Sequence, residues 1–220
     1  LIHLAGKAHD LKKVSNHQEY YDANYELTKQ LFDAFLISES QLFIFFSSVK
    51  AVADDVNRLL NETQTPNPQT HYGKSKLLAE NYILSKELPP NKRIFILRPC
   101  MIHGPGNKGN LNLLYQLSSK GLPWPLGDFE NQRSFCSIEN LCFVINEIIN
   151  NINIPSGVFN LADNHPISTN RLIELIAISQ NKKAIVYKIP KKLIITIAKL
   201  GDYIKFPLNS ERLQKLTESY

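Results

Sequence analysis

A tyrosine and a lysine four residues apart form the segment of this chain with the clearest chemical potential. The sequence reads Tyr72-Gly73-Lys74-Ser75-Lys76 at the start of a predicted helix. On a helix this spacing places both side chains on one face, one turn apart. An ammonium beside a phenol favours the phenolate, so a hydroxyl that normally titrates near ~10 can exchange protons closer to neutral pH. Tyr72 and Lys76 are therefore candidates for acid–base chemistry, although ordinary exposed helix pairs share the same spacing.

Two serines follow a run of apolar residues upstream of this pair. Residues 42–46 read LFIFF, which is typical of a strand buried on both faces of a parallel sheet, and Ser47 and Ser48 come next. Hydroxyls at the carboxyl end of such a strand lie where open α/β sheets bind ligands. The alternative is a serine pair that simply ends a strand.

The elements that must position these residues lie further upstream. Residues 1–6 read LIHLAG, which predicts another buried strand leading into a turn of small residues, where a flat ligand can approach the backbone. Residues 20–28 read YYDANYELT and open an amphipathic helix with Leu27, Leu31 and Phe35 on its buried side.

The rest of the chain alternates strands with helices, which predicts an α/β fold with a parallel sheet and helices on both faces. Residues 54–69 form a polar loop, and Ser168 with its neighbours gives a capping signal for the helix that follows. The expected strands span residues 1–5, 42–47, 93–98, 157–161 and 184–188, and the expected helices span 18–37, 70–87, 109–120, 138–150, 168–180 and 190–200.

Composition describes an ordinary globular protein. The 220 residues are 43% hydrophobic and 20% charged. The net charge of +5 indicates a solvated surface rather than a nucleic-acid or membrane site, and it would also suit an anionic ligand. No run approaches the ~18 apolar residues of a membrane span, and no signal-peptide pattern opens the chain. The six histidines lack metal-binding spacing, so we expect no metal. A reducing, cytoplasmic location is predicted by three cysteines without a CxxC pair, Cys100, Cys136 and Cys142.

The order of the motifs LIHLAG, YYDAN, FIFFSS, HYGKSK, ILRP and HGPGN resembles that of the extended short-chain dehydrogenase/reductases, the NAD-dependent epimerase/dehydratase family. The resemblance covers nearly the whole chain. It implies a partial Rossmann-type NAD(P)-binding domain at residues 1–105 and a mainly substrate-binding part at 106–220, with 157–162 returning to the main sheet. Because LIHLAG corresponds to the family's fourth strand and no GxxGxxG motif is present, we expect a fragment that lacks the N-terminal segment.

The resemblance also implies roles for individual residues of the acid–base site. Tyr72 matches the family's acid/base, Lys76 its partner that also grips the nicotinamide ribose, and Ser48 the hydroxyl that binds the reacting oxygen, with Ser47 the weaker match. The resemblance also implies that six residues contact the cofactor: His3, Ala5, Gly6, Asn24, Tyr72 and Lys76. An equal alternative for His3 is a buried histidine whose hydrogen-bond partners lie within the protein core. For Asn24 the equal alternative is a structural hydrogen-bonding residue.

Two residues match the family's substrate contacts, in addition to Ser48. Asn110, in a glycine-rich turn, resembles a nucleotide-contacting asparagine, and Arg133 aligns with an arginine that clamps the pyrophosphate. A surface arginine is the alternative for Arg133. The chain departs from the family at His103, where relatives often have tyrosine, and in the loop after the serines, which lacks the usual Tyr-Gly pair.

The activity implied is that of a nucleotide-sugar epimerase with NAD, which oxidises a UDP-hexose or UDP-N-acetylhexosamine transiently at C4. The alternative is an NAD(P)H-dependent 4-ketoreductase of a UDP-4-keto-6-deoxy sugar in surface polysaccharide synthesis, and a third is a non-catalytic sugar-nucleotide or dinucleotide binder. NADP remains the alternative cofactor. The expected partner is a UDP-sugar, the expected assembly a homodimer, and neither nucleic acid nor membrane insertion is expected.

Overall fold

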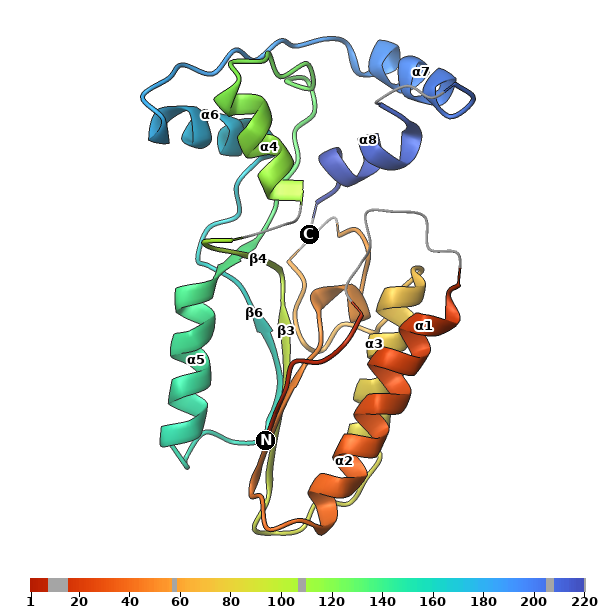
Figure 1. The fold of residues 1–220 in the computed structure, drawn as a ribbon, viewed down its shortest axis with the longest axis vertical. Helices are drawn as coiled ribbons and strands as arrows, with labels where there is room; N and C mark the ends of the chain where they lie inside the picture. Colours follow the sequence, from red (N-terminus) through yellow and green to blue (C-terminus); the bar gives the residue numbers. More distant parts are fainter. Residues whose placement is uncertain (8–15, 57–58, 107–109, 205–207, 220) are drawn as a thin grey trace. The chain divides into compact units, whose positions relative to one another are not determined.

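The computed structural model describes residues 1–7, 16–56, 59–106, 110–204 and 208–219. The chain divides into two compact units (Figure 1). Unit 1 comprises Leu1–Ile102 and Phe135–Asp163, and unit 2 comprises His103–Ser134 and Asn164–Tyr220. Unit 1 thus includes all of residues 135–163, a longer segment than the residues 157–162 that were expected to return to the main sheet.

Unit 1 is built on a four-stranded parallel sheet in the order β1-β2-β3-β6. Aromatic and β-branched residues fill β2 and β3, which suits central strands covered on both faces. The sheet confirms four of the five expected strands, and its members are β1 (Ile2–His3), β2 (Leu42–Phe46), β3 (Arg93–Pro99) and β6 (Gly157–Leu161).

Helices cover both faces of this sheet (Figure 1). A long helix runs through α1 (Gln18–Tyr21), a π-helical turn η1 (Asp22–Glu26) and α2 (Leu27–Ile37), and it packs with α3 (His71–Leu84) on one face. On the other face lies α5 (Ile138–Asn150). The expected helix at 18–37 is confirmed in its bounds, whereas its π-helical turn was not foreseen.

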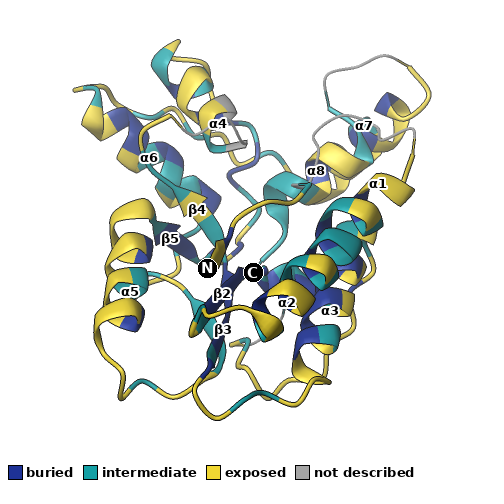
Figure 2. Ribbon diagram, turned by 60° about the horizontal axis from the view of Figure 1, so that its bottom comes forward, coloured by how far each residue is buried: buried dark blue, intermediate teal, exposed yellow. Residues whose placement is uncertain are grey.

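The strand period separates the two apolar layers of unit 1. Phe43 and Phe45 of β2 pack with Phe32 and Phe35 of α2 on one face, while Ile44 between them packs with α5 on the other. Side chains of a strand alternate between the faces of a sheet, so consecutive apolar residues supply both layers. Figure 2 shows the strands buried between helices whose outer faces are exposed.

Unit 2 contains four helices in the residues that the structure describes, α4 (Asn110–Ser119), α6 (Thr169–Ser179), α7 (Lys191–Gly201) and α8 (Ser210–Thr217). Ser168 caps α6 by accepting a hydrogen bond from the Arg171 amide at 3.0 Å, as its sequence signal predicted. The apolar core of this unit includes Leu114, Trp124, Leu126, Ile173 and Ile194.

Some elements differ from the expectation. The predicted strand at 184–188 is wrong, because Val186 and Lys188 make only isolated bridges, to Trp124 and Leu126. A short pair of strands, β4 (Met101–His103) and β5 (Phe135–Ser137), was not predicted, and neither was α8. These segments are short, and their patterns are too weak to identify from sequence.

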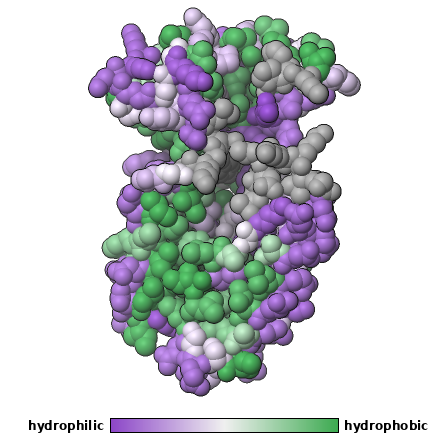
Figure 3. Space-filling model, in the orientation of Figure 1, coloured by the Kyte–Doolittle hydropathy of each residue, from purple (hydrophilic) through white to green (hydrophobic). Residues whose placement is uncertain are grey.

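Three further observations concern exposed apolar residues, membrane spans and metal sites. Apolar side chains gather on the side of unit 1 that carries β1 (Figure 3), where Leu1, Ile2 and Leu4 are exposed. Within the described ranges, none of the helices has both the length and the apolar character needed to cross a membrane. Nor does that part of the chain bring together three or more His, Cys, Asp or Glu side chains able to hold a metal ion.

Candidate active site in unit 1

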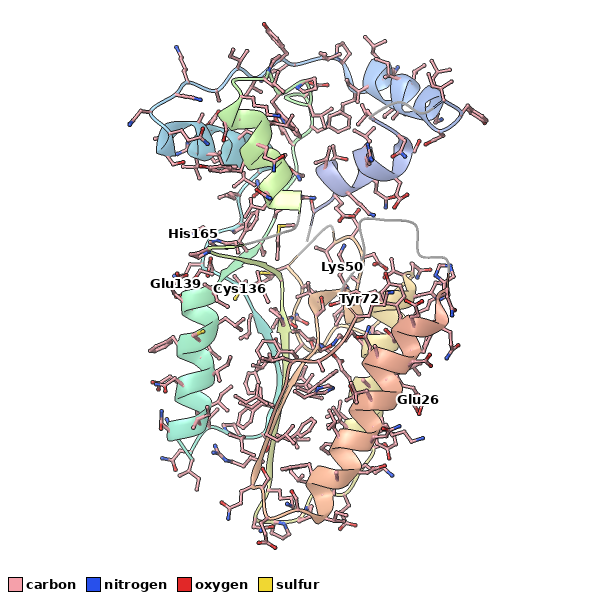
Figure 4. The ribbon with its side chains drawn as sticks, in the orientation of Figure 1. Glu26, Lys50, Tyr72, Cys136, Glu139 and His165 are labelled. Atoms are coloured by element: carbon pink, nitrogen blue, oxygen red, sulfur yellow. The ribbon has the colours of Figure 1, made fainter. Side chains whose placement is uncertain are left out.

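Tyr72 and Ser48 meet at the carboxyl end of the parallel sheet. Tyr72 lies in the first turn of α3, whose N-terminus is capped by the Thr70 hydroxyl. Ser48 follows β2 in an extended conformation and caps a short 3₁₀ helix, η2 (Val49–Ala51). The hydroxyls of Ser48 and Tyr72 are hydrogen-bonded to each other. Figure 4 shows Tyr72 beside Lys50, in the turn that carries Ser48.

Gly73 allows the first turn of α3 to pack directly on this turn. A Cβ at position 73 would lie 2.3 Å from the Lys50 carbonyl oxygen and 2.8 Å from Cβ of Pro68. Both contacts are shorter than real Cβ atoms accept, and the first is with backbone, so a side chain here would force the two segments apart. The sequence places a glycine next to Tyr72, but it gives no sign of this contact.

Asp54 joins the same two segments through its carboxylate. It accepts hydrogen bonds from the backbone N–H of Gln69 at 2.6 Å and from the Thr70 hydroxyl at 3.0 Å. The Thr70 amide also donates to it, at 3.3 Å. A carboxylate at a helix N-terminus is favoured by the free N–H groups there. Asp54 therefore fixes the start of α3 relative to the chain that follows Ser48.

Lys76 lies one turn beyond Tyr72 and is buried, with 6% of its surface exposed. Its Nζ donates a hydrogen bond to the Phe46 carbonyl oxygen at 2.8 Å and sits 4.9 Å from the centre of the Phe45 ring. Burial lowers the pKa of Lys76 to about 8, against the opposing charge of Glu80. An ammonium in this state can lose its proton close to physiological pH.

The pKa of Tyr72 moves against the expectation drawn from the motif. Burial raises the pKa of the phenol above its ordinary value, and nearby Tyr20 acts in the same direction. The hydrogen bond from Ser48 opposes the shift because it stabilises the phenolate. The Lys76 ammonium is held by the Phe46 carbonyl. Proximity to Lys76 therefore does not by itself activate Tyr72.

His3 belongs to a buried hydrogen-bond chain behind this pair. Its Nε2 is 2.8 Å from the Thr28 hydroxyl, which in turn donates to the Asn24 carbonyl oxygen at 2.7 Å. Because the single hydroxyl proton of Thr28 is committed to Asn24, Nε2 of His3 is the donor in the first bond. Burial, and secondarily the charge of Lys76, lowers the pKa of His3 to about 4, so the ring is neutral. These contacts match the core-histidine alternative.

Asn24 holds the loop after β1 against α3. Its amide oxygen accepts from the Lys7 backbone N–H at 2.8 Å, and its amide nitrogen donates to the Ser75 hydroxyl at 3.0 Å and to the Lys7 carbonyl oxygen at 3.1 Å. Asn24 lies in the π-helical turn, which buries it completely. Such turns inside α-helices are frequent at functional sites.

The exposed backbone at Ala5 and Gly6 lies directly against the side chains of Asn24 and Lys76. A Cβ on Gly6 would be 2.6 Å from Oδ1 of Asn24 and 3.2 Å from Nζ of Lys76. The loop therefore brings bare backbone to the ammonium, as a site for a flat ligand requires. The structure thus brings Ser48, Tyr72 and Lys76 together with the predicted cofactor segment in unit 1, but contacts with a cofactor stay predictions.

The predicted substrate residues Asn110 and Arg133 belong to unit 2. Asn110 begins α4, and its side chain lies outside the described residues. Arg133 is buried, with 1% exposed, and its guanidinium donates to the backbone carbonyls of Glu218, at 3.2 Å, and Lys215. Arg133 is therefore not a surface arginine but ties the segment before β5 to the end of α8. A pyrophosphate contact of Arg133 stays a prediction.

Residues 1–162 match the NAD dependent epimerase/dehydratase family. Over 187 residues the chain is 32% identical to a UDP-glucose 4-epimerase of Vibrio cholerae, covering 83% of this chain and 57% of that protein. It is also 31% identical, over 74% of its length and 50% of the relative, to N-acetyl-alpha-D-glucosaminyl-diphospho-ditrans,octacis-undecaprenol 4-epimerase of Escherichia coli O157:H7. The chain thus spans about half the length of these curated relatives.

A solved structure shares the fold. The UDP-glucuronic acid 4-epimerase of Bacillus cereus in complex with NAD superimposes with a TM-score of 0.71 at 23% identity, over 86% of this chain and 61% of that one. At this identity the likeness concerns the fold alone. It agrees with the Rossmann-type architecture that the motifs predicted.

Proposed function

Since the chain belongs to the NAD dependent epimerase/dehydratase family, we propose that the protein carrying it inverts the C4 hydroxyl of a UDP-sugar with NAD as cofactor. One observation carries the proposal: the Tyr72 hydroxyl is hydrogen-bonded to Ser48, and Lys76 lies one turn further along the same helix face. The curated relatives that resemble the chain are named as 4-epimerases of UDP-glucose and of a lipid-linked N-acetylglucosamine.

Each residue of the trio has a distinct task in this proposal. Tyr72 removes the proton from the O4 hydroxyl and later returns it, while the Ser48 hydroxyl holds the same oxygen by a hydrogen bond. The buried Lys76 ammonium supplies positive charge beside the phenol, so that the phenolate forms more readily once O4 has been bound. To act as the base, Tyr72 must be the phenolate, so in this proposal it first loses its own proton to solvent, a loss that burial opposes and the Ser48 hydrogen bond favours.

The residues behind the trio fit a nicotinamide dinucleotide. The loop at Ala5 and Gly6 offers bare backbone close to the Lys76 ammonium, an arrangement suited to the hydroxyls of a ribose and to a flat ring. When bound, NAD supplies a hydride acceptor for the sugar carbon. In this proposal Lys76 and the backbone of Ala5 and Gly6 hold the nicotinamide half, while Asn24 and His3 keep that backbone in place from behind.

Replacing Tyr72 by phenylalanine tests the proposal in the protein that carries this chain, loaded with NAD. Tyr72→Phe keeps the ring but removes the proton shuttle, so kcat with UDP-glucose or UDP-N-acetylglucosamine should fall ~10²–10⁴-fold. Binding of UDP, measured by calorimetry, should change little. Tyr25→Phe is the matched control, because this tyrosine packs against Tyr82 away from the trio and should leave kcat unchanged.

Two outcomes would overturn the proposal. The first is near-normal turnover of Tyr72→Phe. The second is a wild-type protein that consumes reduced nicotinamide cofactor stoichiometrically and forms no C4 epimer, since an epimerase returns the hydride and consumes none.

A further inference from the structure

Glu80 is a buried carboxylate that the proposed mechanism does not use. It lies two turns beyond Tyr72 and one turn beyond Lys76 on α3, with 1% of its surface exposed. Both of its oxygens are bound by Arg98 of β3, from Nε at 2.9 Å and from Nη2 at 2.5 Å. The Ser47 hydroxyl also donates to this carboxylate. Glu80 therefore joins α3 to the ends of two strands.

We propose that Glu80 is a positioning residue that holds the two halves of the catalytic trio together and places a carboxylate one helical turn from Lys76. One half is the end of β2, where Ser47 binds Glu80 and its neighbour Ser48 binds Tyr72. The other half is the face of α3 that carries Tyr72, Lys76 and Glu80 at successive turns. This inference rests on the proposed function, since it concerns the same trio.

The two serines divide these tasks. Consecutive residues of an extended chain point to opposite sides, so Ser47 and Ser48 cannot both face the same group. Ser47 is buried and bonded to Glu80, whereas Ser48 is partly exposed and bonded to Tyr72. A shift of Glu80 would therefore reach Ser48 through a single peptide unit.

The charges around Lys76 support the electrostatic half of the proposal. On α3, Tyr72 and Glu80 each lie one turn from Lys76, and on β1 the neutral His3 feels the charge of the ammonium. Arg98 lies beyond Glu80 and binds its carboxylate directly. Glu80 is the nearby anion that raises the pKa of Lys76 against burial. Without that anion, the buried ammonium would lose its proton at lower pH.

The geometry of the ion pair argues against a purely stabilising purpose. Nη1 of Arg98 is buried and has no hydrogen-bond partner among the described residues. A buried ion pair that leaves a donor unpaired contributes little stability compared with an apolar pair of similar size. The Glu80–Arg98 ion pair lies next to Lys76 on α3 and to Ser48 through Ser47, so positioning these residues accounts for the pair better than stability does.

The test measures the titration of Lys76 directly in the NAD-free protein that carries this chain, by NMR of isotope-labelled lysine side chains, with Lys76→Arg to identify the signal. Glu80→Gln should raise the acid dissociation constant of Lys76 by roughly tenfold or more, because a nearby charge typically shifts a pKa by about one unit or more. Glu87→Gln, on the exposed segment after α3, is the control and should leave it unchanged.

A second variant separates positioning from folding. Glu80→Gln alone leaves the Arg98 charge buried and unpaired, which can destabilise the protein whatever its effect on Lys76. The double variant Glu80→Gln/Arg98→Gln removes both charges. If Glu80 acts on Lys76, the changed titration persists in the double variant, and the alkaline limb of the kcat–pH profile moves to lower pH in parallel.

The proposal is overturned if Lys76 titrates as in the wild type in the Glu80→Gln variant. In the double variant the change in the Lys76 titration should keep its direction but be smaller, because loss of the Arg98 charge by itself favours the ammonium. Because the NMR measurement needs no substrate, it stands even when the protein has no epimerase activity. A missing activity with a changed Lys76 titration would refute the proposed function while supporting the role of Glu80.

Discussion

At the residue scale, burial moves the proton affinities of Tyr72 and Lys76 in opposite directions. It raises the pKa of the phenol and lowers the pKa of the ammonium to about 8, because burial disfavours the charged form of each group. At neutral pH the resting pair is therefore a phenol beside a largely protonated lysine. The phenolate needs further stabilisation, which the Ser48 hydrogen bond supplies in part.

His3 gives a pH-dependent prediction at the same scale. Its pKa is about 4 in the folded protein against 6.5 ordinarily, so between these values the unfolded chain binds more protons. The free energy of unfolding should therefore fall as the pH drops from 6.5 to 4, by about 1–3 kcal/mol. Urea unfolding at pH 7, 5.5 and 4.5 measures this loss.

His3→Gln is the comparison for that measurement. Glutamine retains a donor for Thr28 but does not titrate, so this part of the pH dependence should disappear. If the variant and the wild type lose the same stability on acidification, His3 is not the group responsible.

At the element scale, α3 has two separate constraints at its start, the Asp54 carboxylate and the space left by Gly73. The carboxylate binds the free N–H groups, and the missing side chain lets the helix approach the turn after Ser48. Together these fix the Tyr72 hydroxyl relative to Ser48 more narrowly than the helix alone would. The site therefore depends on a close contact between two backbones.

Gly73→Ala should disturb that contact. The new Cβ would displace α3 from the Lys50 carbonyl, so we expect kcat to fall ~10–100-fold, as small misplacements of catalytic groups do, with a loss of ~1–3 kcal/mol in stability. Gly157→Ala is the matched control, because a Cβ there meets the Phe159 ring at an ordinary 3.4 Å. Equal kinetics of the two variants would show that α3 tolerates the side chain.

At the scale of the whole molecule, the chain forms two units with separate cores, and the predicted site residues are divided between them. The proposed acid–base trio and the loop backbone at Ala5 and Gly6 belong to unit 1, which contains most of the segment that matches the family. Arg133 belongs to unit 2, where its buried guanidinium satisfies two carbonyl groups at the end of α8.

Arg133→Ala should therefore affect unit 2 alone. Losing hydrogen bonds from a charged group typically costs ~1.5–3 kcal/mol, so hydrogen exchange of α8 should accelerate while α3 in unit 1 stays protected. Arg171→Ala, which removes an exposed ion pair with Glu174, should leave the hydrogen exchange of both α8 and α3 unchanged. Unchanged exchange of α8 in Arg133→Ala would contradict the structural role.

Calorimetry with UDP on the same variants tests the predicted phosphate contact of Arg133. Weakened binding at unchanged α8 exchange would assign the residue to the ligand, whereas faster exchange with normal affinity would assign it to the fold.

The sequence by itself determined the strands of the main sheet and the long helices of unit 1. Apolar runs identified the four strands, the 3.6-residue period identified the helix at 18–37, and the Tyr72–Lys76 spacing identified one face of α3. The family resemblance followed from the same motifs and is confirmed. These features are local, since each depends on residues within a few turns or one strand of each other.

Only the tertiary structure decided what surrounds the trio. The partners of Glu80 come from residues 18 and 33 positions away along the chain, and no sequence period links them. No sequence period indicates three other features either: the Gly73 contact, the π-helical turn at Asn24 and the carbonyl partners of Arg133. The pKa of Tyr72 followed burial rather than the neighbouring lysine, because desolvation depends on packing from every side, which the order of residues does not specify.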